Sequence, residues 1–200
     1  MALMSIDDVW TRDGPLTVDD LAYVADDERY RYELVDGRLE MSPAPRGVHV
    51  RVQHRLGFYL ESVAPAGYEI LGEPGVTMNG ARTHHRRPDM AILHAEDFEE
   101  RYLTRPPLLV VEVESPESAY RDAYTKRQEY AEFGIPSNWI IYPYRENPGI
   151  VELRLDQGHY QEVTGIKGEG LFETDTPFPI RFVPHWLVAD GDWKKHISGD

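Results

Sequence analysis

Residues 106–142 constrain the fold of this chain more than any other stretch. Their pattern is that of an apolar strand, a helix and a second strand in succession. Leu108 to Val111 are apolar without alternation, as expected for a strand that is covered on both faces. Residues 116–133 carry an apolar stripe at helical spacing, and residues 138–142 (NWIIY) have the composition of a strand. This strand–helix–strand unit predicts a right-handed crossover between two parallel strands.

Shorter elements surround this unit. Asp36-Gly37 separates two alternating runs within residues 32–41, which predicts a two-residue hairpin. We also expect helices over residues 16–26 and 47–63, strands near residues 68–73, 76–78 and 89–95, a final hairpin over 149–164, and a Pro-rich segment over 176–184 that wraps the surface. Hairpins combined with one parallel crossover predict an α/β (α+β) fold, with a mixed β-sheet flanked by helices.

Length and composition narrow the classes of protein further. A chain of 200 residues favours a single domain over residues 1–200, with a core at about 16–185 and short flexible termini. Cysteine is absent, which excludes disulfides and thiolate metal sites. No apolar run is long enough to span a membrane, and MALMSIDDVW lacks the features of a signal peptide, so we expect a cytoplasmic location.

The formal net charge of −14 argues against loose attraction to nucleic acid. It leaves room for a local basic groove, or for a cation that neutralises a group of carboxylates. The charge therefore weighs against nucleic-acid binding without excluding it.

Carboxylates stand where two of the expected strands begin or end. Glu112 and Glu114 close the apolar strand and share one face, about 6–7 Å apart along the chain. Asp89 opens another strand after Pro88, so Asp89 and Glu112 converge if those strands are neighbours. Two oxygen ligands plus water suit Mg²⁺ or Mn²⁺, and a substrate phosphate can complete the shell. Such a metal can activate water for attack on a phosphoryl group.

Lys126 lies on the apolar stripe of the following helix, beside Ala123 and Tyr130. Its ammonium could reach the carboxylates and there orient the attacking water or stabilise developing negative charge. The alternative is a structural lysine that extends to solvent and pairs with Asp122 or Glu129. Both interpretations stay open on the residues alone.

Four motifs in order resemble the Uma family: YELVDGRLEMSPAP at 32–45, RPD at 87–89, VVEVESP at 110–116 and RDAYTKRQEYAEFGIPSNWII at 121–141. This family is a bacterial group of restriction-endonuclease-like proteins within the PD-(D/E)xK nuclease superfamily. The resemblance covers roughly residues 16–185. It implies a restriction-endonuclease-like core, a mixed sheet flanked by helices, with a metal site at the edge of the sheet.

The resemblance also implies roles for four residues. Asp89 matches the PD aspartate and Glu112 the first residue of the ExK element, and both would bind the metal. Glu114 stands where that element has its lysine, and the family looks as though it supplies the lysine from the next helix, here Lys126. Glu33 matches the glutamate of the YEL segment and is an additional catalytic carboxylate, with a solvated hairpin residue as the alternative.

Other residues have two interpretations each. His49 matches a histidine that follows the proline-rich turn in the family, and it either touches the site or packs elsewhere. His84 and His85 are adjacent and predict a solvated loop pair. The arginines within residues 82–87 either meet phosphates or solvate a loop. Trp139 is expected to pack in the core, although an aromatic near the site could stack on a base.

The leading hypothesis is a metal-dependent endonuclease that hydrolyses DNA phosphodiester bonds with Mg²⁺ or Mn²⁺. The alternative is a catalytically inactive nuclease-fold module for binding or regulation, which Glu114 and the charge of −14 favour. A structural or assembly protein on the same core is a third option. The resemblance also implies a homodimer, because nucleases of the superfamily often pair to address two strands.

Overall fold

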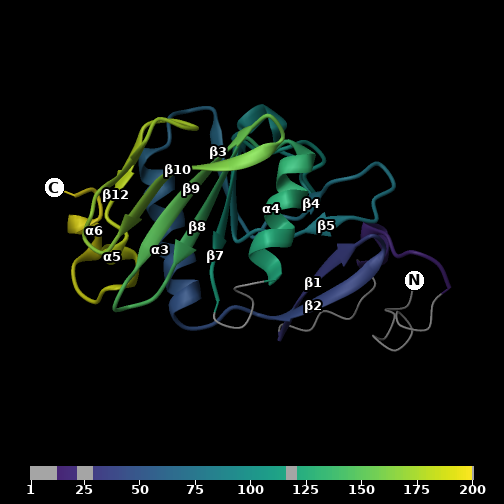
Figure 1. Ribbon diagram of the computed structural model, residues 1–200, viewed down its shortest axis with the longest axis horizontal. Coiled ribbons are helices and arrows are strands. Elements are labelled where there is room, and N and C mark those ends of the chain that lie inside the picture. The colour runs from purple at the N-terminus through teal and green to yellow at the C-terminus, as the bar shows by residue number, and fades with distance from the viewer. Residues whose placement is uncertain (1–12, 22–28, 116–120, 200) are drawn as a thin grey trace. The chain divides into compact units, whose positions relative to one another are not determined.

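The computed structural model describes residues 13–21, 29–115 and 121–199 (Figure 1). The chain forms two compact units, which we call the hairpin unit and the sheet unit. The hairpin unit comprises Met1–Pro45, Gly75–Arg87 and Glu99–Arg105, and the sheet unit comprises Arg46–Pro74, Pro88–Phe98 and Pro106–Asp200. The expectation of one nuclease-like domain over residues 1–200 stays a prediction.

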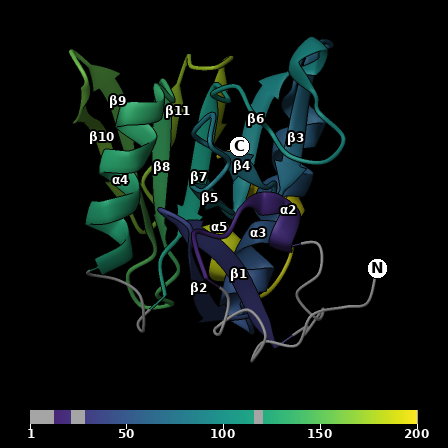
Figure 2. The same ribbon diagram turned by 90° about the vertical axis from the view of Figure 1, so that its right-hand side faces the viewer.

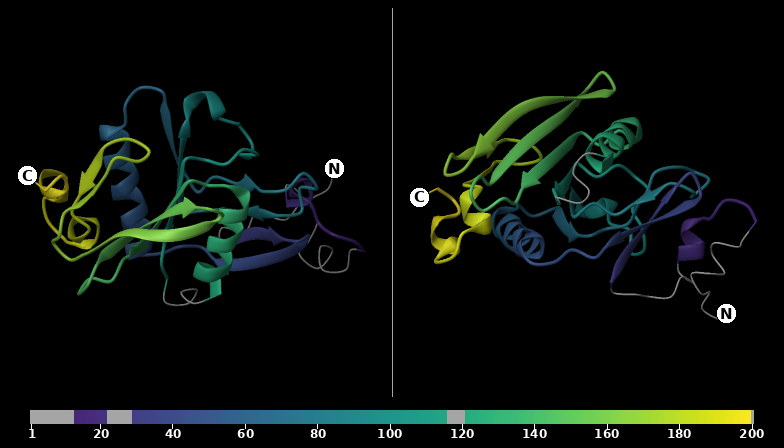
Figure 3. Two further views of the ribbon diagram at one scale, coloured as in Figure 1. Left: turned by 45° about the horizontal axis from the view of Figure 1, so that its top comes forward. Right: turned by 60° about the horizontal axis from the view of Figure 1, so that its bottom comes forward.

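A six-stranded mixed sheet forms the sheet unit, in the order β10-β9-β8-β7-β6-β3. Its strands are β3 (Tyr68–Gly72), β6 (Met90–His94), β7 (Leu109–Val113), β8 (Ser137–Tyr142), β9 (Gly149–Asp156) and β10 (His159–Lys167). Only the β7–β8 pair is parallel among these strands, and β9 and β10 form the expected long hairpin (Figure 3). A short 3-10 helix, η1 (Ala95–Asp97), follows β6.

The crossover predicted from the sequence is present. Helix α4 (Arg121–Phe133) joins β7 to the parallel strand β8, and β7 lies inside the sheet between β6 and β8. Gly134 follows the helix with φ 89°, a left-handed conformation that glycine adopts without a steric penalty. The expected start of this helix at Pro116, with Ala119 on its stripe, lies outside the described residues, as does the side chain of Asp122.

The two faces of the sheet are covered by different helices. Val111 and Val113 of β7 belong to a cluster with Val52, Leu56 and other buried residues of α3 (Val48–Val63). Glu112, between those valines, points to the other face and contacts α4, which lies along the strands there (Figure 2). Strand alternation therefore assigns neighbouring residues of β7 to different helices.

The Pro-rich segment over 176–184 was expected to wrap the surface, and this expectation is wrong. It forms strand β12 (Ile180–Phe182), paired with β11 (Phe172–Thr174), and Phe178, Ile180 and Phe182 are at most 3% exposed. Pro179 and Arg181 alternate with them and face solvent. The prolines made the segment look like a loop, although its residues alternate between buried and exposed as in an ordinary strand. Helices α5 (His185–Val188) and α6 (Trp193–His196) follow.

The hairpin unit contains a four-stranded sheet in the order β2-β1-β5-β4. Its strands are β1 (Tyr30–Val35), β2 (Arg38–Pro43), β4 (Val76–Thr77) and β5 (His85–Arg86). The hairpin predicted at Asp36-Gly37 is confirmed, since β1 pairs with β2 and both turn residues have positive φ, 50° and 77°.

The expected helix over 16–26 is described from Val18 to Leu21 as α2, and residues 22–26 lie outside the described part of the chain. Asp20 accepts a hydrogen bond from the backbone N–H of Thr17 at 2.8 Å, as in a capping box at the start of a helix. None of the described helices has the length and apolar character that a membrane crossing requires.

Candidate functional site

Glu112 and Lys126 meet on the face of the sheet that α4 covers. The ammonium of Lys126 lies 3.3 Å from Oε1 of Glu112 and 3.5 Å from Oε2. Both side chains are largely buried, at 14% exposed for Lys126 and 18% for Glu112. Tyr130, one helical turn after Lys126, donates its hydroxyl to Oε1 of Glu112 at 2.5 Å. Lys126 thus turns toward Glu112, as its place on the helical stripe predicted.

Asp89 is 1% exposed and lies just before β6. Its Oδ1 lies 2.9 Å from Nε2 of His49 and 3.0 Å from Nε2 of Gln53, and both of these residues are on α3. Its Oδ2 accepts the backbone N–H of Val113 at 2.7 Å. Because Asp89 is bound to the residue that follows Glu112, the N-terminal end of β6 is tied to the C-terminal end of β7.

The relation between Asp89 and Glu112 follows from the strand register. The β6–β7 ladder ends at the pair Met90–Val111, and Asp89 and Glu112 each adjoin this pair in the sequence. The expectation that the strands of Asp89 and Glu112 are neighbours is confirmed, because β6 pairs with β7. The carboxylate of Asp89 is held from α3 and that of Glu112 from α4, so the two helices approach this end of the β6–β7 pair from opposite faces.

Glu114, in the place of the expected ExK lysine, is engaged by tyrosine. The hydroxyl of Tyr144 donates to its Oε2 at 2.9 Å. Burial raises the pKa of Tyr142 and of Tyr144, with a further rise from the charge of Glu114 for Tyr142 and from the hydrogen bond to Glu114 for Tyr144. The position that would carry an ammonium therefore carries a carboxylate that accepts a tyrosine hydrogen bond.

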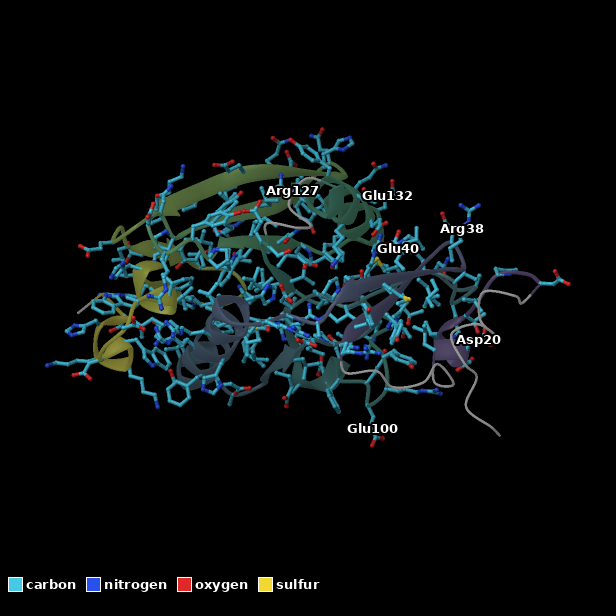
Figure 4. All side chains as sticks on the ribbon, turned by 90° about the horizontal axis from the view of Figure 1, so that it is seen from below. Asp20, Arg38, Glu40, Glu100, Arg127 and Glu132 are labelled. Carbon is cyan, nitrogen blue, oxygen red and sulfur yellow. The ribbon has the colours of Figure 1, made fainter. Side chains whose placement is uncertain are left out.

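Glu33 belongs to the hairpin unit and is buried there, which rules out the solvated hairpin residue. Its Oε2 accepts a hydrogen bond from Nη1 of Arg86 at 3.1 Å, and its Oε1 accepts the backbone N–H of Arg87 at 2.7 Å. Arg86 also lies 2.7 Å from Glu40, which is labelled in Figure 4 and is half exposed. Glu33 thus holds the segment that precedes Pro88 and Asp89 in the sequence. Its part in catalysis stays a prediction.

The expectation of a solvated loop pair is wrong for His85, whereas His84 lies outside the strand and is partly buried. His85 is 2% exposed in β5, where its Nδ1 lies 3.1 Å from Oγ1 of Thr77 and its ring meets Tyr102 edge-on. Burial lowers the pKa of His85 to about 4. A strand of two residues has too little pattern for sequence analysis to detect, which explains the error.

Three residues that contact the carboxylates differ in how far the sequence indicated them. His49 contacts Asp89, the interpretation that was open for it, and Tyr130 had been placed on the helical stripe as a core residue. Gln53 was missed. Gln53 could have been found from its position four residues after His49, because residues four apart on a helix share a face. Lys126 and Tyr130 have the same spacing on α4.

The side chains at this end of the β6–β7 pair offer ligands for a divalent cation. Asp89 and Glu112 offer carboxylate oxygens at the ends of paired strands, and these are ligands that Mg²⁺ and Mn²⁺ prefer. Within the described residues, no three His, Asp or Glu side chains are arranged to enclose a metal by themselves. The residues present therefore fit a cation that shares its shell with water and substrate oxygens, and they do not fit an all-protein cage.

Comparison with known proteins bears on the fold and on the family of the chain. A solved structure with a similar fold is that of a protein from Anabaena variabilis, described as "a putative nuclease belonging to DUF820". The two chains superpose with a TM-score of 0.60 at 17% sequence identity, over 80% of this chain and 89% of the other. At this identity the likeness establishes the fold alone, a mixed sheet flanked by helices, as expected.

No functionally curated protein matches the sequence. A family model described as "Uma2: Putative restriction endonuclease" matches residues 18–190. That match covers most of the chain and includes the hairpin motif, Asp89, Glu112 and Lys126. The chain therefore belongs to the Uma2 family, as its four motifs indicated.

Proposed function

We propose that this protein is a divalent-metal-dependent nuclease that hydrolyses phosphodiester bonds in DNA. The observation that supports this most is the ammonium of Lys126, 3.3 Å from Glu112. This ammonium comes from α4 and is largely buried. It provides the positive charge that is missing at position 114, where a glutamate stands in the place of the expected lysine. Membership of a family described as restriction endonucleases supports the same reaction class.

Asp89 and Glu112 would hold a Mg²⁺ or Mn²⁺ ion. When bound, such an ion withdraws electrons from phosphate oxygens and makes coordinated water a stronger nucleophile. The protein's own contribution is to fix both carboxylates. Asp89 is held by His49, Gln53 and the backbone of Val113, and Glu112 is held from α4.

Lys126 would act on the substrate through its charge. Its distances to Glu112, 3.3 and 3.5 Å, are longer than the ~2.7–2.9 Å of a strong charge-assisted bond. A phosphate oxygen can therefore compete for the ammonium, which would stabilise negative charge as the phosphorus is attacked. Glu33 is the remaining member of the proposed catalytic set, on the strength of its motif.

The test is a cleavage screen over single-stranded, double-stranded and branched DNA with Mg²⁺ or Mn²⁺, followed by variants. Lys126→Met keeps much of the apolar stem and removes the charge, so we expect it to fold and to cleave at least ~100-fold more slowly. Lys195→Met, at an exposed lysine of α6, is the matched control and should cleave like wild type. Wild-type cleavage by Lys126→Met would refute the role of the lysine.

Metal binding is tested separately. Asp89→Ala and Glu112→Ala should each abolish Mn²⁺ binding in calorimetry, because the site has too few ligands to lose one. Unchanged Mn²⁺ affinity in both variants would remove these residues from the site.

The second candidate function is a binding or regulatory module on an inactive nuclease fold. The observation that favours it is Glu114, which accepts a hydrogen bond from Tyr144 where a lysine would serve catalysis. DNA binding without cleavage by wild type, with any metal or substrate in the screen, would establish this reading. We also propose a homodimer, and sedimentation that detects only monomer at micromolar concentration would count against it.

A further inference from the structure

The hydroxyl of Tyr130 donates a short hydrogen bond to the carboxylate of Glu112. Its distance of 2.5 Å to Oε1 lies at the short end of the ~2.5–2.7 Å range for a hydroxyl that donates to a charged carboxylate. The ammonium of Lys126 is farther away, at 3.3 and 3.5 Å from the two oxygens. The orientation of Glu112 is therefore set more by the neutral hydroxyl than by the charged lysine.

Tyr130 is also the more firmly held of the two donors. Its side chain is 0% exposed, whereas that of Lys126 is 14% exposed and has four rotatable bonds. A packed aromatic ring keeps its position when the groups around it exchange partners. The lysine can move between Glu112 and another anion, and the tyrosine remains in place.

We propose that Tyr130 is a positioning residue for the reaction, and this inference rests on the proposed nuclease function. It holds Glu112 in the orientation in which the carboxylate binds the divalent cation. Because that orientation does not depend on Lys126, the lysine can turn from Glu112 to a substrate phosphate while Glu112 keeps its alignment. One turn of α4 thus carries a fixed donor and a mobile one, both directed at the same carboxylate.

The test is Tyr130→Phe, which keeps the ring and removes only the hydroxyl. Tyr124→Phe is the matched control on the same helix, because that ring is 65% exposed. We expect Tyr130→Phe to weaken Mn²⁺ binding in the absence of DNA by ~10-fold and to slow single-turnover cleavage by a similar factor, the scale found when a group that orients a metal ligand is removed. KM for DNA should stay unchanged, and Tyr124→Phe should match wild type in both assays.

A double-mutant cycle separates positioning through Glu112 from an effect through Lys126. If Tyr130 orients Glu112 independently of the lysine, Tyr130→Phe should weaken Mn²⁺ binding by the same factor in a Lys126→Met background as in wild type. A loss of Mn²⁺ affinity that disappears in the Lys126→Met background would overturn the proposal, because the hydroxyl would then act through the lysine.

The outcomes for wild type distinguish this inference from the proposed function. If wild type binds Mn²⁺ and cleaves, and Tyr130→Phe does both equally well, the positioning role alone is wrong. If wild type neither binds Mn²⁺ nor cleaves DNA, the nuclease function and the positioning role both fail. A Tyr130→Phe protein that unfolds at the assay temperature would also overturn the proposal, since the hydroxyl would then be required for the fold.

Discussion

Replacing Glu33 by glutamine is expected to destabilise the protein far more than the same replacement at Glu40. Both carboxylates lie against Nη1 of Arg86, at 3.1 Å for Glu33 and 2.7 Å for Glu40. The side chain of Glu33 is 11% exposed and that of Glu40 is 52% exposed, whereas Arg86 is 4% exposed. The two sites therefore differ in burial, with the longer contact at the buried one, and in the backbone N–H of Arg87, which Glu33 also accepts.

Burial sets the magnitude of each loss. Removing one partner of a buried ion pair costs about 3–5 kcal/mol, because the other charge is left without compensation. Arg86 would keep Glu40, so we expect the low end of that range, about 3 kcal/mol, for Glu33→Gln. A solvent-exposed pair contributes about 0.2–1 kcal/mol, so Glu40→Gln should cost no more than about 1 kcal/mol.

Urea unfolding of wild type and both variants measures these free energies. Equal losses for the two variants, or a larger loss for Glu40→Gln, would refute the argument that burial outweighs distance here. The same proteins test the proposed catalytic role of Glu33. Folded Glu33→Gln should cleave DNA more slowly than folded Glu40→Gln, and equal rates would remove Glu33 from the catalytic set.

Three further predictions concern other parts of the chain. Burial holds the pKa of His85 at about 4, below the 6.5 of an unperturbed histidine. At pH values below 6.5 the unfolded state therefore binds more protons at this residue than the folded state does. The free energy of unfolding should fall by about 3 kcal/mol between pH 6.5 and pH 4 for this reason. His85→Gln should remove that part of the pH dependence, as urea unfolding across this range will show. Glu114→Lys should restore part of the cleavage lost in Lys126→Met, because residue 114 is two positions after Glu112 in the segment that continues β7 beside β8, whereas Glu114→Gln should restore none. Phe182→Ala should cost about 3–5 kcal/mol in thermal or urea unfolding, because its ring is fully buried against Trp139 and Phe172; a loss below 1 kcal/mol would contradict that packing.

Local sequence patterns were sufficient for most elements of the fold. The parallel crossover was predicted from the apolar run in β7, the apolar stripe of α4 and the glycine that ends this helix. Strands and helices have different side-chain periods, and a dozen residues are enough to tell the two apart. Asp36-Gly37 determined the hairpin and its register. A two-residue turn of this kind needs positive φ at both positions, and Asp-Gly is one of the few pairs that adopt it readily. The same patterns placed Lys126 on the inward face of its helix.

The partners of the carboxylates depended on tertiary structure. His49 and Gln53 lie about 40 residues before Asp89 in the sequence, and Glu33 lies about 50 residues before Arg86. Nothing in a local pattern specifies which helix will cover which face of a strand. The alternation of β7 separates Glu112 from Val111 and Val113, and only the packing of α4 against that face brings Tyr130 to its carboxylate.

Burial of polar and proline-rich segments was likewise decided by the fold. His85 looked like a surface loop, and Phe178 to Phe182 looked like a surface strap, because short strands and prolines obscure the period that marks a buried strand. The sequence by itself determined the order and type of the main elements, and it indicated which carboxylates and which lysine they carry toward one another. Only the tertiary structure decided which donors hold each carboxylate, because hydrogen bonds between distant segments depend on how helices and strands pack, and a local sequence period carries no record of that packing.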